Sequence, residues 1–469
     1  MELLAPAGGW EQLQFAICFG ADAVYLGTDR FGMRARADNF QLDEMPQVVA
    51  YAHERGVKIH VTINTQMYED DFADLPVYIR ALAQAGVDAF IISDLGAFAL
   101  AKEEAPQVDI HVSTQASISN SQAALTWYKL GAKRIVCARE MSLAAIAEMR
   151  QKLPSDLEIE VFAHGSMCMA VSGRCLISDY MTGRSGVAGN CAQPCRWKYA
   201  LQEETRPGEY YPIEEDESGS YIMNAKDLCM LEHLDKLRDA GIDAIKIEGR
   251  NKKAFYVATV VNAYRQVLDG ADAAAFMDEL DTVSHRPYST GFYFGPAHQT
   301  PEDDRYTRHY QWAFEAIHIE ELSDINSATC RSAVQNPAQQ DSSCASLLHA
   351  SKEIASQSNR NSVQTVASSI SDNSSTASGS SNCFTVTGLC RNKFEEGDTL
   401  EVLSPHQPIR TCTVQNLHYV GVDPDHPGFP PAADVYPGPV QAANRTMELY
   451  SFTVPFEVAP HDIFRIRRD

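Results

Sequence analysis

Short apolar segments alternate with amphipathic helical segments along the first 300 residues of the chain. The helical segments include MPQVVAYAHERG and LPVYIRALAQAG, and the apolar ones have the length and pattern of strands. Eight strands are predicted, at residues 2–7, 22–27, 58–64, 89–94, 109–115, 134–140, 158–164 and 244–250. This alternation predicts an α/β fold, a (β/α)8 TIM-like barrel over residues 1–300. An open, doubly wound sheet is the alternative, but the glycine-rich phosphate fingerprint typical of it is absent from the sequence.

Polar residues gather at the C-terminal ends of these predicted strands. In a barrel of this type, that end carries the chemistry. Any one such residue can instead cap a helix or join an ion pair, but so many together predict a site. We predict catalytic roles for His164, Glu248, Arg34 and Arg36, and substrate binding by Asn64, Gln115, Arg139, Lys246 and Arg250.

Four cysteines follow the seventh predicted strand within 28 residues: Cys168, Cys175, Cys191 and Cys195. Glycines between them let the backbone bend, and four thiolates brought together can hold a metal centre. Structural zinc sites usually have two close pairs of ligands, whereas here only the last two cysteines are close. The spacing therefore favours an iron–sulfur cluster. Disulfides, and structural cysteines without a metal, are the alternatives.

The chain carries a formal net charge of −23, so an anionic partner has to meet a local basic patch. No apolar run is long enough to cross a membrane, and the first residues lack the pattern of a secretion signal. We therefore expect a cytoplasmic protein. Candidate contacts for RNA phosphates lie in three clusters: Lys129, Lys133 and Arg134; Arg196 and Lys198; and Arg250, Lys252 and Lys253.

The stretch after the cysteines departs from the barrel pattern. WKYALQEE and SYIMNAKDL alternate like the strands of a hairpin, and Cys229 follows at the start of the predicted helix CMLEHLDKLRDAG. We interpret residues 165–230 as an insertion that carries the cysteine cluster. A second unit at residues 309–469 has short strand patterns with Gly and Pro turns, which predict a small antiparallel β-barrel. Its residues 323–381 are rich in Ser, Asn and Gln and are predicted to form a disordered insertion.

Several segments resemble a known protein family. LLAPAG, DAVYLG, FAHGSMCMAVSGRCLIS and KIEGR are similar to the collagenase-like proteins of family thirty-two of the unclassified peptidases. RARADNF, CRWKY and HRPYSTGF resemble one branch of it, the prephenate-dependent tRNA uridine hydroxylation (TrhP-like) proteins. The resemblance implies a [4Fe–4S] cluster on Cys168, Cys175, Cys191 and Cys195. Another branch has its fourth ligand at the position of Cys229, so Cys195 and Cys229 compete for that role.

The same resemblance implies a function: oxygen-independent hydroxylation of the tRNA wobble uridine to 5-hydroxyuridine. It implies tRNA as the partner and a prephenate-derived metabolite as co-substrate, and it allows homo- or hetero-oligomers with a related family member. The family name implies peptide hydrolysis instead, but the sequence has no HExxH pair, and clustered thiols do not suit a cysteine protease. A serine protease would need Ser166, His164 and Asp94 to meet in the fold. A non-catalytic, tRNA-binding cluster protein is the third alternative.

Overall fold

The computed structural model describes residues 1–33, 37–168, 171, 175–197, 200–201, 211–212, 226–295, 309–322, 383–422 and 436–468. The predicted catalytic residues Arg34 and Arg36 lie outside these ranges, as does the predicted disordered insertion. The chain divides into two compact units. The first is Met1–Trp312 with Leu403–Ile409 and Arg467–Asp469, and the second is Ala313–Val402 with Arg410–Ile466.

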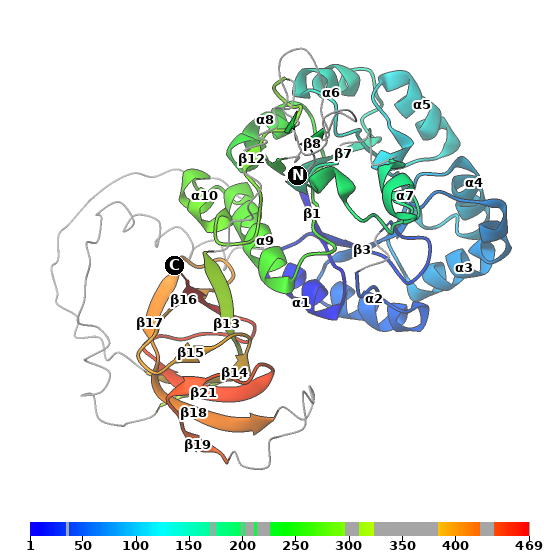
Figure 1. Cartoon of the computed structure of the whole chain (residues 1–469). Helices are drawn as coiled ribbons and strands as arrows, with labels where there is room; N and C mark the ends of the chain where they lie inside the picture. The colour runs from blue at the N-terminus through cyan, green and yellow to red at the C-terminus, as the bar shows by residue number, and fades with distance from the viewer. Residues whose placement is uncertain are drawn as a thin grey trace, which may run out of the picture. The chain divides into compact units, whose positions relative to one another are not determined.

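The first unit contains a closed barrel of eight parallel strands, as predicted (Figure 1). Strands β1 to β7 follow one another around the barrel, and β11 closes it by pairing with both β7 and β1. Helices cover the outside, so the strands are buried on both faces, which explains their short apolar runs. The strands are β1 (Glu2–Pro6), β2 (Ala23–Leu26), β3 (Lys58–Ile63), β4 (Ala89–Ile92), β5 (Asp109–Val112), β6 (Arg134–Val136), β7 (Glu158–Ser166) and β11 (Ala244–Ile247).

The helices alternate with the strands and surround them (Figure 1). None of the described helices is long and apolar enough to span a bilayer. Asp94 caps α4, because its side chain accepts a hydrogen bond from the Ala97 N–H. The helices are α1 (Trp10–Cys18), α2 (Met45–His53), α3 (Leu75–Ala85), α4 (Leu95–Glu104), α5 (Ser121–Leu130), α6 (Leu143–Arg150), α8 (Leu234–Asp239), α9 (Ala254–Leu268) and α10 (Ala274–Leu280).

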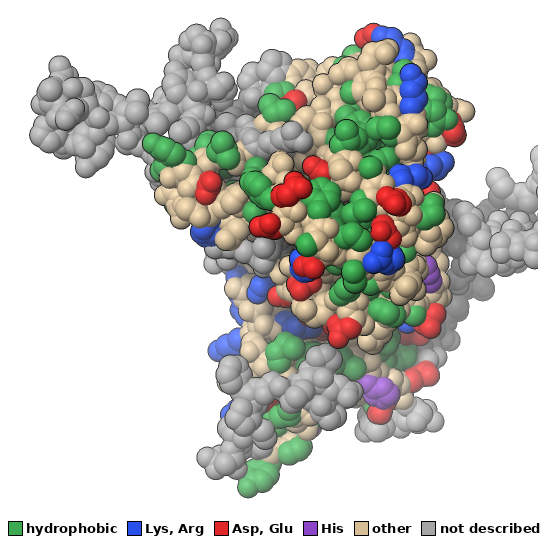
Figure 2. Space-filling view, turned by 90° about the vertical axis from the view of Figure 1, so that its right-hand side faces the viewer, with side chains coloured by type: hydrophobic (Ala, Val, Ile, Leu, Met, Phe, Trp, Pro, Cys, Tyr) green, Lys and Arg blue, Asp and Glu red, His purple; other side chains and the backbone are tan. Residues whose placement is uncertain are grey.

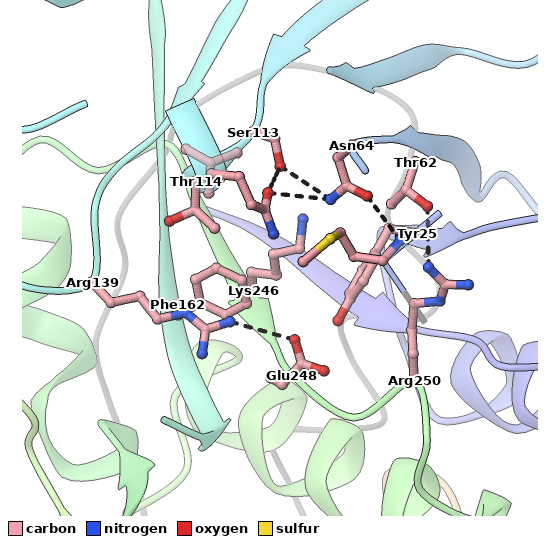
Figure 3. Close-up of a pocket in the computed structure, with 13 residues that line it drawn as sticks. Tyr25, Thr62, Asn64, Ser113, Thr114, Arg139, Phe162, Lys246, Glu248 and Arg250 are labelled. Carbon is pink, nitrogen blue, oxygen red and sulfur yellow. Dashed lines mark hydrogen bonds and ion pairs between the residues drawn. The ribbon is translucent and has the colours of Figure 1, made fainter. Parts of the chain in front are cut away.

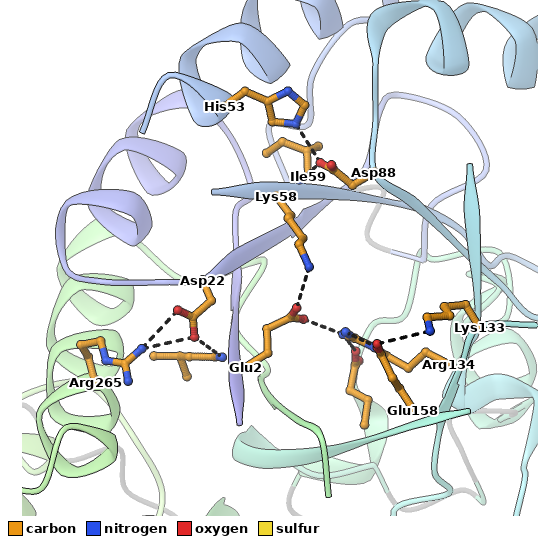
Figure 4. Close-up of polar contacts among 12 residues, drawn as sticks. Glu2, Asp22, His53, Lys58, Ile59, Asp88, Lys133, Arg134, Glu158 and Arg265 are labelled. Carbon is orange, nitrogen blue, oxygen red and sulfur yellow. Dashed lines mark hydrogen bonds and ion pairs between the residues drawn. The ribbon is translucent and has the colours of Figure 1, made fainter. Parts of the chain in front are cut away.

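A repeated Gly-x-Asp-Ala pattern ties strands together at the N-terminal end of the barrel (Figure 4). Each aspartate precedes one strand and accepts a backbone hydrogen bond from the strand beside it. Asp22 accepts from the Leu3 N–H at 2.8 Å, and Asp88 accepts from the Ile59 N–H at 2.7 Å. Asp243 does the same for β7. The pattern therefore fixes the register of neighbouring strands where each pair begins.

Charged side chains fill the barrel interior near the same end (Figure 4). Arg134 Nη1 lies 2.6 Å from Glu2 Oε1 and 3.0 Å from Glu160 Oε2, and its Nη2 lies 2.6 Å from Glu158 Oε2. Lys58 Nζ lies 3.5 Å from the other oxygen of Glu2. Both Arg134 and Glu160 are almost completely buried. This end of the barrel is thus closed by ion pairs that satisfy one another.

The predicted RNA contacts at Lys129, Lys133 and Arg134 lie at this closed end. Arg134 begins β6, Lys133 precedes it, and Lys129 lies in the last turn of α5. These three residues therefore lie at the end of the barrel opposite the pocket-forming C-terminal ends of the strands, because helices and strands run in opposite directions in the barrel.

The segment between β7 and β11 departs from the regular barrel. It contains α7 (Ile177–Thr182), the 3₁₀ turn Pro194–Arg196, β8 (Ala200–Leu201), β9 (Tyr211–Pro212) and β10 (Asp227–Cys229). β8 pairs with β9, and the end of the predicted hairpin strand SYIMNAKDL belongs to β10, which pairs antiparallel with β7. Residues 213–225 of that stretch lie outside the described ranges. Cys229 ends β10 and does not begin a helix, and β12 (Tyr288–Ser289) pairs with β10.

The second unit is an antiparallel β half-barrel, in agreement with the predicted small antiparallel barrel. Its strands lie in the order β17-β16-β22-β13-β14-β21-β18-β19, and their inward residues form one apolar core. β17 and β18 follow each other directly along the chain and are separated at the buried Val414. The strands are β13 (Tyr310–Glu321), β14 (Phe384–Cys390), β16 (Thr399–Leu403), β17 (Arg410–Thr413), β18 (Gln415–Val422), β19 (Gly438–Pro439), β21 (Glu448–Val454) and β22 (Ile463–Arg467), with β15 (Phe394–Glu395) paired to β20 (Ala442–Ala443).

Candidate functional site

A pocket opens among the C-terminal ends of the barrel strands (Figure 3). Its empty space, which includes space open to solvent, is about 390 Å³. All five predicted substrate-binding residues and Glu248 line it. Sequence reasoning missed the other lining residues, which lie on or next to strands whose apolar pattern hid them. The lining is Tyr25, Met33, Thr62, Asn64, Ser113, Thr114, Gln115, Val136, Arg139, Phe162, Lys246, Glu248 and Arg250.

One side of the pocket is a fixed set of amide and hydroxyl groups. Asn64 Nδ2 donates to Ser113 Oγ at 3.2 Å and to Gln115 Oε1 at 3.3 Å. Asn64 Oδ1 accepts from the Met33 N–H at 3.2 Å, which fixes the orientation of the amide. These groups come from the ends of β3 and β5 and point toward one another (Figure 3). The side is therefore preorganised for hydrogen bonding to a polar ligand.

The opposite side combines a cation, an aromatic ring and a carboxylate. The Arg139 guanidinium lies 3.7 Å from the centre of the Phe162 ring, and its Nη2 lies 3.4 Å from Glu248 Oε2. Arg139 Nη1 donates to the Ser166 carbonyl at 2.8 Å, which leads directly into the cysteine segment. Stacking and two hydrogen bonds hold the guanidinium plane in place.

Arg250 forms a third part of the lining. Its Nη1 donates to Thr62 Oγ1 at 3.1 Å, and its Nη2 donates to Asn39 Oδ1. The guanidinium reaches these partners by passing over Gly27. A Cβ at Gly27 would lie only 2.5 Å from Arg250 Nη2, so this position requires glycine.

Lys246 connects the pocket to the charged interior. Its side chain is 5% exposed, and its Nζ lies 3.1 Å from Glu160 Oε1 and 4.1 Å from the centre of the Tyr25 ring. Burial lowers the pKa of Lys246 from its ordinary value, although Glu160 opposes that shift. With Arg139, Arg250 and Lys246 against the single carboxylate of Glu248, the lining favours an anionic ligand.

His164 does not line this pocket. The register between β7 and β11 skips Ala163, and this bulge turns His164 out of the barrel. Its ring lies against Tyr256, Tyr264 and Tyr288, and its Nδ1 is 3.4 Å from the Tyr264 hydroxyl. Burial lowers the pKa of His164 to about 3, so the imidazole is neutral. The structure thus brings Glu248, but not His164, to the pocket.

The cysteine segment is tied to the pocket on two sides. Arg139 binds the Ser166 carbonyl at its start, and the Gln66 N–H donates to the Val187 carbonyl at 3.1 Å near its middle. Within the segment, Ser178 Oγ accepts from the Ala192 N–H and donates to the Arg184 carbonyl. The segment therefore folds around a buried serine beside the residues that line the pocket.

The described sulfur atoms suit a cluster in their chemistry. Cys168 and Cys191 are exposed, while Cys175 and Cys195 are half-buried. A Cβ at Gly186 would lie 3.2 Å from the Cys175 carbonyl oxygen and 3.9 Å from Cys191 Sγ. The glycine therefore lets the backbone at residue 186 come close to Cys175 and Cys191. The Gln193 N–H donates to Cys191 Sγ at 3.3 Å. In the described part of the chain, no three His, Cys, Asp or Glu side chains are close enough to hold a metal ion.

Cys229 lies in a different environment. It pairs with His164 across β10 and β7, and its Sγ is 3.9 Å from the Tyr264 hydroxyl. Burial raises the pKa of the Cys229 thiol to about 11. The thiol is therefore protonated and packed in the barrel wall, whereas Cys168 and Cys191 are exposed.

The remaining basic residues do not form one continuous patch in the described part of the chain. Lys252 Nζ donates to the Ser284 carbonyl at 2.8 Å, and Lys253 precedes α9. Lys198 and the side chain of Arg196 lie outside the description. On the face shown in Figure 2, Lys and Arg side chains alternate with Asp and Glu side chains.

The fold and the pocket define a class of protein: a (β/α)8 barrel with a cation-rich pocket at its C-terminal end and a cysteine segment beside it. The chain belongs to peptidase family U32, whose model matches residues 8–303. It is 41% identical over 302 residues to tRNA hydroxylation protein P1 of Bacillus subtilis (strain 168), covering 63% of this chain and 71% of the relative.

Two further proteins are similar to this chain. tRNA hydroxylation protein P of Escherichia coli (strain K12) is 36% identical over 338 residues, covering 62% of this chain and 74% of the relative. Among solved structures, that of the U32 peptidase Mk0906 is 13% identical, covers 53% of this chain and 92% of its own, and has a TM-score of 0.36.

Proposed function

We propose that this protein hydroxylates tRNA, and specifically that it supports oxygen-independent conversion of the wobble uridine to 5-hydroxyuridine. The observation that carries the proposal is the cysteine segment beside the pocket, hydrogen-bonded to the lining residue Arg139 and to Gln66, which lies two residues after the lining residue Asn64. Two relatives with 41% and 36% identity are named for tRNA hydroxylation, which supplies the substrate class. A wobble base belongs to a single-stranded loop and can be splayed out into a pocket.

We further propose that Cys168, Cys175, Cys191 and Cys195 hold a [4Fe–4S] cluster. When bound, such a cluster supplies electron transfer next to the pocket. Cys195 is preferred to Cys229 as the fourth ligand, because Cys229 is packed against Tyr264 and its thiol stays protonated. The protein's own part is to keep the other thiols accessible on a loop that Ser178 organises.

The pocket residues bind and orient the substrate in this proposal. The flat Phe162 ring gives a nucleobase an apolar face, and the amides of Asn64 and Gln115 match the polar edge of a uracil. Arg139 and Lys246 suit the carboxylates of a prephenate-derived co-substrate. Both ligand types carry polar groups that match the polar side chains of the lining.

Peptide hydrolysis finds no comparable support among the described residues. His164 is turned toward the tyrosines of α9, and Asp94 is used as the cap of α4. Ser166, His164 and Asp94 therefore do not form a catalytic triad. A non-catalytic role in tRNA binding would leave the pocket residues dispensable, which the following experiment tests.

The test is complementation of cells that lack the protein, with 5-hydroxyuridine in tRNA measured by nucleoside mass spectrometry. Cys191→Ala and Glu248→Gln should each abolish the modification, and anaerobically purified Cys191→Ala should lose iron and sulfide. Cys412→Ala, which alters a buried thiol of the second unit, is the matched control and should restore the modification. Ser166→Ala should also restore it.

Two results would overturn the proposal. Full modification of tRNA in cells that carry Cys191→Ala would mean that the cluster is not needed for the function. Peptide cleavage by the purified protein, lost in Ser166→Ala and accompanied by unchanged tRNA, would establish the peptidase alternative. Loss of the cluster in Cys229→Ala but not in Cys195→Ala would exchange the fourth ligand.

A further inference from the structure

Lys246 is an unusual residue for the floor of a pocket. Its Nζ lies among the ring of lining side chains (Figure 3), yet its side chain is only 5% exposed. The ammonium has one hydrogen-bond acceptor in the structure, Glu160 Oε1 at 3.1 Å. The Tyr25 and Phe162 rings lie 4.1 and 5.6 Å from Nζ. An ammonium needs up to three acceptors, so this one is poorly solvated.

Glu160 does not depend on Lys246 for its charge balance. Its other oxygen, Oε2, lies 3.0 Å from Arg134 Nη1, and Arg134 is a permanent cation. A neutral Lys246 would therefore leave Glu160 paired. Burial lowers the pKa of Lys246, which makes the neutral amine more accessible than in water. A buried, partly desolvated lysine amine is a nucleophile for carbonyl groups.

Arg139 lies on the same aromatic ring as Lys246. Its guanidinium is 3.7 Å from the Phe162 ring centre, so both cations lie near this ring, and both line the pocket. Stacking and the Ser166 carbonyl fix the guanidinium plane, but most of its five N–H donors are not used by these contacts. A planar guanidinium with available donors binds a carboxylate.

We propose that Lys246 captures the carbonyl group of a small oxo acid as an imine, while Arg139 binds the carboxylate of the same acid. This inference deepens the proposed function and rests on it, since it names the class of co-substrate that the pocket takes. It concerns the chemistry of the pocket alone and needs neither tRNA nor a cluster.

The step balances within the described residues. The Lys246 ammonium passes one proton to Glu160, which is in hydrogen-bonding distance. The amine nitrogen then forms a bond to the carbonyl carbon, and a second amine hydrogen moves to the oxygen. Glu160 returns its proton as the C–O bond breaks and water leaves. The product is an iminium ion that keeps the positive charge beside Glu160, and no oxidant or reductant is consumed.

The test is reductive trapping on the purified full chain. The protein is incubated with pyruvate or 2-oxoglutarate and sodium cyanoborohydride, and peptides are mapped by mass spectrometry. We expect a reduced adduct on Lys246 and none with lactate, which lacks the carbonyl group. Lys246→Arg keeps the charge and should lose the adduct. Lys252→Arg, whose lysine binds the Ser284 carbonyl away from the pocket lining, is the control and should keep it.

Arg139→Met tests the second half of the proposal. It should lower the adduct yield with either acid by roughly tenfold, because a charge-assisted pair is lost. It should leave trapping of dihydroxyacetone, an uncharged carbonyl compound, unchanged, which a misfolded variant would not do. Equal yields for the acids in the variant and the parent protein would overturn the carboxylate assignment.

Absence of a Lys246 adduct with both acids in the folded parent protein would overturn the inference. An equal adduct in Lys246→Arg would do the same, because trapping would then be nonspecific. Either result leaves the proposed function intact if tRNA still carries the modification. Conversely, normal trapping in Cys191→Ala together with lost modification separates the pocket chemistry from the cluster.

Discussion

The two ends of the barrel use similar charged residues in different ways. At the N-terminal end, Arg134 binds Glu2, Glu158 and Glu160, so its charge is matched by carboxylates on three sides. At the C-terminal end, Arg139 meets one carbonyl group, one carboxylate at 3.4 Å and one aromatic face. The first arrangement is complete without a ligand. The arrangement around Arg139 leaves N–H donors that a ligand can use. This difference distinguishes a stabilising site from a binding site.

The comparison predicts that an Arg→Met substitution mainly lowers stability at the N-terminal end and mainly impairs function at the C-terminal end. Arg134→Met removes one of the two cations that pair with the fully buried Glu160 and the nearer of the two that pair with Glu158, which should lower the free energy of unfolding by about 3–5 kcal/mol. Arg139→Met should lower it by about 1 kcal/mol or less, because an unbranched methionine side chain can still cover the Phe162 ring on which the guanidinium stacks. Denaturant unfolding measures both, and nucleoside mass spectrometry should find the modification lost in Arg139→Met.

The comparison fails if the two variants lose similar stability. The double variant Arg134→Met with Glu160→Gln serves as a further control. It also removes the buried carboxylate that lost its Arg134 partner and should recover part of the loss, since replacing both members of a buried ion pair costs less than removing one of them.

Two buried histidines in the barrel interior predict that the stability of the fold decreases at acid pH. His60 and His111 pack edge to face with ring centres 4.7 Å apart, beneath the pocket. Burial lowers the pKa of His60 to about 4 and that of His111 well below its ordinary value. The unfolded chain binds protons below about pH 6.5, while the folded chain does not. Stability should therefore be complete above pH 6.5 and fall by roughly 2 kcal/mol or more toward pH 4.

Unfolding midpoints measured from pH 7.5 to pH 4 check this slope. His60→Gln should reduce the slope, whereas His53→Gln, which changes a half-exposed residue on α2, should leave it unchanged. Below pH 4.5 a further loss should begin, because the Arg134 contact holds the pKa of the buried Glu2 at about 2. A flat profile down to pH 4 would mean that the histidines are solvated or charged in the folded protein.

The sequence predicted the barrel well because a parallel strand covered by helices must be a short apolar run. It also predicted six lining residues, since Asn64, Gln115, Arg139, Lys246, Glu248 and Arg250 all follow or end strands and alternation points them inward. Thr62 and Phe162 were missed because they lie within strands and look like core residues. The local sequence pattern does not show whether an inward-pointing strand residue lies beside the pocket or deeper in the barrel interior.

Two errors arose from backbone irregularities that alternation cannot reveal. The bulge at Ala163 turns His164 to the outside of the barrel. Gly165 with φ of 102° allows that bulge, because a Cβ there would lie 2.4 Å from the Glu248 carbonyl oxygen. Cys229 was placed in a helix because CMLEHLDKL has helical periodicity, yet pairing with β7 takes it into a strand. In both cases a tertiary contact overrides the local pattern.

The smallest expected change in stability concerns two aspartates near opposite ends of β4. Asp88 accepts a hydrogen bond from the Ile59 N–H at 2.7 Å and lies 2.9 Å from His53 Nε2. Asp94 accepts from the Ala97 N–H at 2.9 Å. Each carboxylate satisfies a backbone donor, so Asp88→Ala and Asp94→Ala should each lower the free energy of unfolding by about 1 kcal/mol.

Asp94 sharpens the comparison because it follows a strand at the functional end without lining the pocket. If position at that end sufficed for function, Asp94→Ala would abolish tRNA modification. Since its carboxylate is engaged by the first turn of α4, we expect near-normal modification and only the loss of stability. Asp94→Asn and Asp94→Ser keep an oxygen acceptor and should restore that stability, as N-caps do. Lost modification in a stably folded Asp94→Ser protein would extend the functional surface beyond the pocket lining to the rim of the barrel.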